Sequence, residues 1–128
     1  MSDALSNDFE THLLNYTFTT TSVTRPTAWY IALHTSNPTD TGANEISGNG
    51  YARQSITFTV SGNTATSNSV VTFPACTGSA WGTITHCSIW TAQTSGTMIG
   101  HSGLTASKTI AVGDIMQCAS GSIVFTLT

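Results

Sequence analysis

Charged side chains are scarce in this sequence. Asp, Glu, Lys and Arg supply only 7% of the 128 residues, and the formal net charge is −3, whereas soluble proteins carry roughly 25% charged residues. Lysine and arginine are limited to Arg25, Arg53 and Lys108. Three cations cannot neutralise the several phosphates on which nucleic-acid affinity depends, and they cannot form a basic patch for an anionic membrane. We therefore expect neither nucleic acid nor membrane as a partner.

Cysteines and long apolar runs are also few. Cys76, Cys87 and Cys118 cannot all pair, and their spacing matches no zinc-binding pattern. We expect reduced, mostly buried thiols, no metal and no cofactor. No apolar run approaches the roughly 18 residues that span a bilayer. The segment Met1–Leu5 lacks the basic start and apolar stretch of a secretory signal, so synthesis in the cytoplasm of the producing cell is expected.

Threonine and serine dominate where charge is absent. Threonine is β-branched and fits a pleated surface, so a Thr-rich, charge-poor chain favours strands. The length suits one domain, and we expect residues 1–128 to form a single β-sandwich with residues 1–24 as an N-terminal helix and arm. The helix is predicted over residues 2–16, because Leu5, Phe9, Leu13 and Tyr16 fall at helical spacing.

Alternating apolar residues and turn formers divide the rest of the chain into short strands. Residues 28–35 carry apolar groups on both faces, as a central strand does. Residues 36–50 are dense in turn formers and predict a long loop. A hairpin is predicted from strands at 51–60 and 65–73 around the turn Ser61–Thr64. Further strands are predicted at 81–91, 98–104, 108–111, 115–119 and 122–127. About seven or eight antiparallel strands favour an all-β, jelly-roll-like sandwich.

No arrangement of reactive residues predicts catalysis. The string Gly100-His101-Ser102-Gly103 lacks the spacing of a nucleophile elbow. His86 and Cys87 are adjacent, so on a strand they point to opposite faces. Asp40 and Glu45 share the long loop, but no calcium-binding pattern is present. The expectation is a protein without enzymatic activity. Three tryptophans leave a sugar-binding surface open as an alternative, although Trp29 and Trp81 alternate with core residues.

Several segments resemble a family of short proteins from tailed-phage genomes. The resemblance covers nearly the whole chain in order and rests on the residues at 29–40 (WYIALHTSNPTD), 45–54 (EISGNGYARQ), 71–75 (VTFPA), 81–86 (WGTITH) and 104–109 (LTASKT). Members are usually labelled phage tail fibre proteins. The resemblance implies a β-sandwich with a short helix, membership of the virion, and no catalytic residues.

Two positions in a virion then compete. A capsid decoration (cement) protein is a compact domain of this length, commonly trimeric, that binds the major capsid protein. A tail fibre ordinarily needs a repetitive shaft, although a fibre tip or adhesin that contacts a host glycan or receptor does not. The sequence favours decoration, with tail proteins as the alternative partners and a homo-oligomer, preferably a trimer, as the assembly state. The predicted contact residues lie in the helix and in the long loop: Leu5, Phe9, Leu13, Tyr16, Asn37, Asp40, Asn44 and Glu45.

Overall fold

The larger sheet contains two adjacent strands that carry several buried side chains. The computed structural model describes residues 4–127, and these residues form ten β-strands, one α-helix and one short 3-10 helix. Strand β2 (Tyr30–His34) lies between β7 (Gly82–Trp90) and β3 (Gln54–Ser55). The order β1-β8-β7-β2-β3 is completed by β8 (Met98–Ile110) and β1 (Ala4–Leu5). Every strand pair in the described residues is antiparallel.

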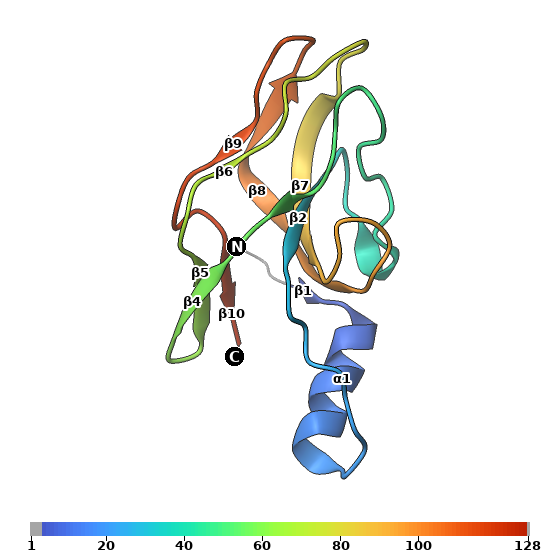
Figure 1. Cartoon of the computed structure of the whole chain (residues 1–128), viewed down its shortest axis with the longest axis vertical. Helices are drawn as coiled ribbons and strands as arrows, with labels where there is room; N and C mark the ends of the chain where they lie inside the picture. The colour runs from blue at the N-terminus through green and yellow to red at the C-terminus, as the bar shows by residue number, and fades with distance from the viewer. Residues whose placement is uncertain (1–3, 128) are drawn as a thin grey trace.

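The second layer consists of two smaller sheets. One has the order β10-β5-β4 and contains β4 (Phe58–Ser61), β5 (Thr64–Ser67) and β10 (Val124–Thr126); the other pairs β6 (Val71–Thr72) with β9 (Gln117–Cys118). The predicted hairpin is confirmed, since β4 and β5 pair around a turn in which Gly62 has φ 58°, a conformation that glycine adopts without steric cost. Figure 1 shows these two sheets beside the five-stranded sheet, with β6 and β9 above β4, β5 and β10.

The core lies between the two layers. Ile31, Leu33, Ile84 and Ile89 of the large sheet are at most 2% exposed, and Phe73 from the smaller layer is 1% exposed. The three cysteines are buried as predicted. The all-β sandwich with a short N-terminal helix is therefore confirmed. Within the described residues, no helix has the length and apolar content needed to cross a bilayer.

Several predicted strands differ in extent. The segments at 98–104 and 108–111 form one continuous strand, β8, because its residues keep pairing with β7 as far as Gly82↔Ile110. The segment at 51–60 is divided into β3 and β4, and Ile56 between them is buried at 2% exposure. The segment at 65–73 likewise divides into β5 and β6. Strand pairing, which the local pattern does not encode, decides these boundaries.

A register shift in β7 changes which side chains share a face. Regular alternation predicts Ile84 beside His86 and places Cys87 and Ile89 on the other side. The pairing with β8 is irregular between Ile84 and His86, and Ile84, Cys87 and Ile89 all join the buried core. The predicted face of Ile84 is therefore wrong, because the irregular pairing interrupts the regular alternation of β7 at this point.

Candidate functional site

Helix α1 (Asn7–Phe18) begins later than the sequence pattern predicts. Ser6 is its N-cap and accepts a hydrogen bond from the Phe9 amide at 3.1 Å. The preceding residues pair with β8 as strand β1, so Leu5 belongs to the sheet and not to the helix. Ser2 and Asp3, which the prediction included, lie outside the described residues. Because a side-chain cap satisfies an otherwise unpaired amide, Ser6 sets where the helix starts.

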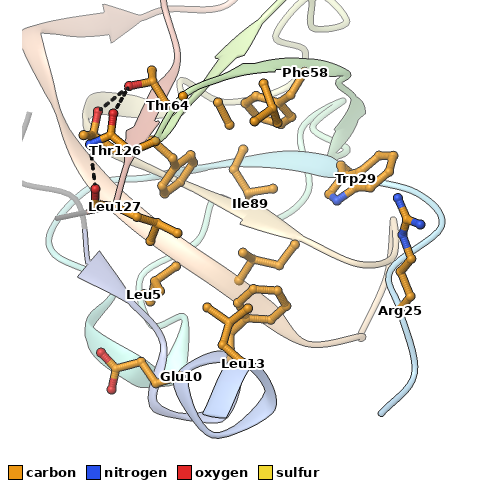
Figure 2. A pocket seen from close by; sticks show the side chains of 17 residues that line it. Leu5, Glu10, Leu13, Arg25, Trp29, Phe58, Thr64, Ile89, Thr126 and Leu127 are labelled. Carbon is orange, nitrogen blue, oxygen red and sulfur yellow. Dashed lines mark hydrogen bonds between the residues drawn. The ribbon is translucent and has the colours of Figure 1, made fainter. Parts of the chain in front are cut away.

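An apolar groove lies between α1 and the smaller layer. It has a volume of about 810 Å³. Figure 2 shows Leu5 and Leu13 on one side of it, Phe58 on the other, and Ile89 of the large sheet between them. The groove is lined mainly by large apolar side chains, namely Leu5, Phe9, Leu13, Trp29, Phe58, Val60, Ile89, Ile99, Phe125 and Leu127. The two layers therefore separate at this end and leave part of their facing surfaces uncovered.

Polar groups occupy only the rim of the groove. Asn63 donates a side-chain hydrogen bond to the Leu127 carbonyl at 2.8 Å, and the hydroxyls of Thr64 and Thr126 lie 3.4 Å apart (Figure 2). These bonds join β5 to the end of the described chain. Among the described lining residues, the charged ones are Glu10 and Arg25. Charges of opposite sign leave the groove with no net charge, so it suits an apolar, uncharged occupant.

Helix α1 also exposes large apolar groups to solvent. None of the described residues Asn7–Phe18 is buried, and Leu14, Tyr16 and Phe18 are 58%, 73% and 78% exposed. Four contact residues were predicted near the N-terminus. Leu5, Phe9 and Leu13 come together at the groove, whereas Tyr16 does not line it. A contact role for all four stays a prediction.

The long loop, in contrast, is fixed by bonds within the chain. It contains the 3-10 helix η1 (Thr39–Thr41). Asn37 accepts from the Thr39 amide at 2.8 Å, and Asn44 donates to the Asn37 carbonyl at 3.4 Å. Asp40 accepts from the Asn7 amide at 3.3 Å, which links the loop to the start of α1. Asn37, Asp40 and Asn44 are exposed, so they remain available for the contact role that the sequence predicts.

Glu45 faces inward and forms an ion pair. Arg53, only 8% exposed, donates from Nε to Glu45 Oε2 at 2.9 Å and from Nη2 to Oε1 at 2.8 Å. Its Nη1 donates to the carbonyls of Ala92 at 3.1 Å and Ser95 at 2.8 Å, and the guanidinium lies 3.8 Å from the centre of the Trp90 ring. This bidentate, stacked geometry is specific to arginine. Arg53 thereby connects the long loop to the loop at 91–97.

The same carboxylate binds a buried phenol. Tyr51 donates to Glu45 Oε2 at 2.7 Å and accepts from the Leu33 amide at 3.1 Å. Burial would raise the pKa of Glu45, but the hydrogen bonds from Arg53 and Tyr51 outweigh it and hold that pKa below its ordinary value. Burial and the bond to Glu45 raise the pKa of Tyr51. Glu45 is therefore a stable anion whose oxygens are already used within the chain.

A serine and a histidine are also hydrogen-bonded in the interior. His34 Nε2 lies 2.7 Å from Ser88 Oγ, and its Nδ1 lies 2.8 Å from the Ala43 carbonyl. Trp90 donates to the same Ser88 oxygen at 2.7 Å. Burial lowers the pKa of His34, and both His34 and Ser88 are 0% exposed. Both side chains are therefore closed off from solvent, and their hydrogen bond joins β2 to β7.

The other described residues considered for catalysis, metal binding or sugar binding do not lie together. Ser102 of the Gly100–Gly103 string is 1% exposed in the middle of β8. No group of three His, Cys, Asp or Glu residues within the part of the chain that the structure describes is placed to hold a metal ion. Trp81 is buried and donates to the Asn49 carbonyl at 2.9 Å, while Arg53 covers Trp90. Trp29 is the tryptophan that lines the groove.

The wall of the groove opposite α1 was not predicted from the sequence. Phe58, Val60, Phe125 and Leu127 of the smaller layer all line it, and alternation alone placed the first two in an ordinary half-buried strand. One signal was available, because Val60 and Leu127 are large apolar residues beside a turn and a strand end, where polar residues are usual.

Comparison with known protein families identifies a family that the chain matches. A family model described as podophage GP4 fiber I protein gp80 matches residues 4–126. The matched segment includes α1, both layers and the lining residues of the groove other than Leu127. No curated protein matches the sequence.

Proposed function

The chain belongs to the family of the podophage GP4 fiber I protein gp80, and from this premise we propose that it is a fibre component of a tailed-phage virion. In this role it would bind other virion proteins and transform no substrate. The match to residues 4–126 carries the proposal, because it extends over the helix, the sandwich and most of the groove. We place its synthesis in the cytoplasm of the bacterial host and its function in the assembled particle.

The structure supports binding over catalysis. A histidine and a serine within hydrogen-bonding distance are both 0% exposed. The open surface is instead an apolar groove with an exposed apolar helix beside it. Contiguous apolar patches of this kind mark sites of protein interaction. Low charge suits the role as well, because the centre of a protein interface is depleted in charged residues.

Capsid decoration is the second candidate. The observation that favours it is the size and form of the chain, since the described residues make one sandwich without a repetitive shaft. A domain of this kind could bind the major capsid protein in many copies. We give priority to the fibre because the family description refers to a fibre, and a separate shaft protein could carry this domain. A glycan-binding tip has less support, because Trp81 is buried and Trp90 is covered by Arg53.

Locating the protein in purified particles tests the proposal. An epitope tag or gold label on the chain, imaged by electron microscopy, should mark the fibres. Label spread over the capsid shell would reject the fibre role and establish decoration. Particles from which the chain is absent in every fraction would reject both.

A further inference from the structure

His34 lies at the centre of a hydrogen-bond network that closes the long loop (residues 36–50) onto the large sheet. Its Nδ1 donates to the Ala43 carbonyl at 2.8 Å, because a carbonyl oxygen can only accept. In the neutral ring, Nε2 therefore carries no proton and accepts from the Ser88 hydroxyl at 2.7 Å. The same hydroxyl oxygen accepts from Trp90 Nε1. His34 is thus a neutral ring in one tautomer, with one nitrogen bonded to the loop and the other to the sheet.

The part of the loop next to His34 is held to the sheet by few contacts. We refer to residues 36–44 as the loop tip. Its last residue, Asn44, accepts a backbone bond from the Thr35 amide at 3.1 Å. Gly42 lies against Trp90, since a Cβ added to this glycine would be 2.5 Å from the ring. Pro38 is the one buried residue of the tip. Segments with few buried side chains open at a lower free energy than the whole fold, so the tip can leave the sheet while the sandwich stays folded.

Protonation of His34 disrupts the network that closes the tip. A proton on Nε2 makes both ring nitrogens donors, so the Ser88 hydroxyl can no longer donate to the ring. Both side chains are 0% exposed, and a buried charge is costly unless it is paired. The Ala43 carbonyl of the tip covers the other ring nitrogen. The charged ring therefore reaches water when the tip moves away from it.

The charged and titratable groups around the ring do not offer a new partner. Glu45 attracts a positive charge at His34, but its oxygens are already bonded to Arg53 and Tyr51. Arg53 repels that charge, as does His86, which is the cross-strand partner of His34 on β7. Burial lowers the pKa of His34 and outweighs the effects that raise it. The closed tip therefore requires the neutral ring.

We propose that the loop tip is an acid-released flap, which detaches from the sheet when His34 takes up a proton while the sandwich remains folded. The tip carries Asn37, Asp40 and Asn44, the exposed residues that the sequence predicts as partner contacts. Acid thereby changes how the protein presents this surface. The inference goes beyond the proposed function, because it concerns the isolated chain and holds for a fibre and for a capsid position alike.

Hydrogen exchange at the Thr35 amide tests the proposal, because this amide is bonded to the Asn44 carbonyl of the tip. In the open form His34 binds a proton near pH 6.5, so the opening constant should rise by up to about tenfold between pH 7.5 and pH 5.5. The protection factor of Thr35, corrected for the intrinsic pH dependence of exchange and measured by NMR, should fall by that amount. The Gly121 amide, bonded to the Ser67 carbonyl in the second layer, is the internal control and should keep its protection.

Low urea concentrations distinguish release of the tip from unfolding of the whole chain. A local opening exposes little surface, so the protection of Thr35 should not change with urea below the unfolding transition. A Thr35 protection that is equal at the two pH values, that falls no more than that of Gly121, or that decreases with urea as core amides do would overturn the proposal.

A substitution at His34 tests whether this ring is the sensor. A glutamine side chain can also donate to a carbonyl and accept from a hydroxyl, but it does not titrate. In His34→Gln the protection of Thr35 should be the same at both pH values. The matched control His12→Gln, on α1, should retain the change of the wild type. An undiminished change in a folded His34→Gln would contradict the proposal, and if circular dichroism shows that this variant is unfolded, the wild-type comparison in urea decides.

Discussion

Arg53 is the residue on which the position of two loops depends. Its guanidinium holds the Glu45 carboxylate and the carbonyls of Ala92 and Ser95. Replacing it by alanine removes the arginine donors of these acceptors and leaves Glu45 with the hydrogen bond from Tyr51, and removal of one partner of a buried ion pair costs ~3–5 kcal/mol. We expect a loss at the lower end of that range in urea unfolding, because the Glu45 side chain keeps 21% exposure. Arg25→Ala, at an exposed position, should change the unfolding free energy little; an equally small effect at Arg53 would contradict this account.

His34 makes the stability of the fold depend on pH. Burial lowers its pKa in the folded state, with opposing effects from Glu45 and reinforcing ones from Arg53 and His86. Unfolded histidine takes up a proton near pH 6.5, so below that pH the unfolded chain binds more protons than the folded chain and unfolding becomes easier. The urea midpoint should therefore be lower at pH 5.5 than at pH 7.5, a range that lies above the titration of Glu45.

A substitution separates His34 from the other histidines. Burial also lowers the pKa of His101, which contributes in the same direction. His34→Gln should lower the urea midpoint at both pH values but reduce the difference between the midpoints at pH 5.5 and pH 7.5. His101→Gln should leave most of that difference in place. A wild-type midpoint that is the same at pH 5.5 and pH 7.5 would show that His34 is not buried as a neutral ring.

At the scale of the element, helix α1 depends on its cap more than on packing. Its described residues include none that is buried, and an isolated helix of this length is marginal in water. Ser6→Ala removes the bond to the Phe9 amide and also the bond that the Ser6 hydroxyl donates to the Met98 carbonyl. The loss of the cap alone should cost about 1 kcal/mol. Hydrogen exchange should then accelerate at the amides of α1 and much less in β2 and β7. Ser22→Ala, outside the helix, is the control; equal exchange in both variants would argue against the cap.

The elements show what the sequence could and could not predict. The apolar segment at β2, the long strand β7 and the β4–β5 hairpin follow from local alternation and turn residues, and all three are present. The start of α1 was misplaced because the pairing of Leu5 with Gly100 competes with helix formation. The irregular pairing near Ile84 was missed for a similar reason. It depends on how β7 pairs with β8, which the alternation of apolar residues does not show.

The arrangement of the layers in the whole molecule explains why the sequence predicted only part of the candidate site. Phe9 and Leu13 were identified from helical spacing, but the opposite wall comes from Phe58 and Phe125, which lie far from them in the sequence. A groove between two layers depends on how far the layers separate. The alternation of apolar and polar residues within either layer does not predict that separation. The loop residues Asn37, Asp40, Asn44 and Glu45 were recognised as one loop, but the inward direction of Glu45 depends on Arg53.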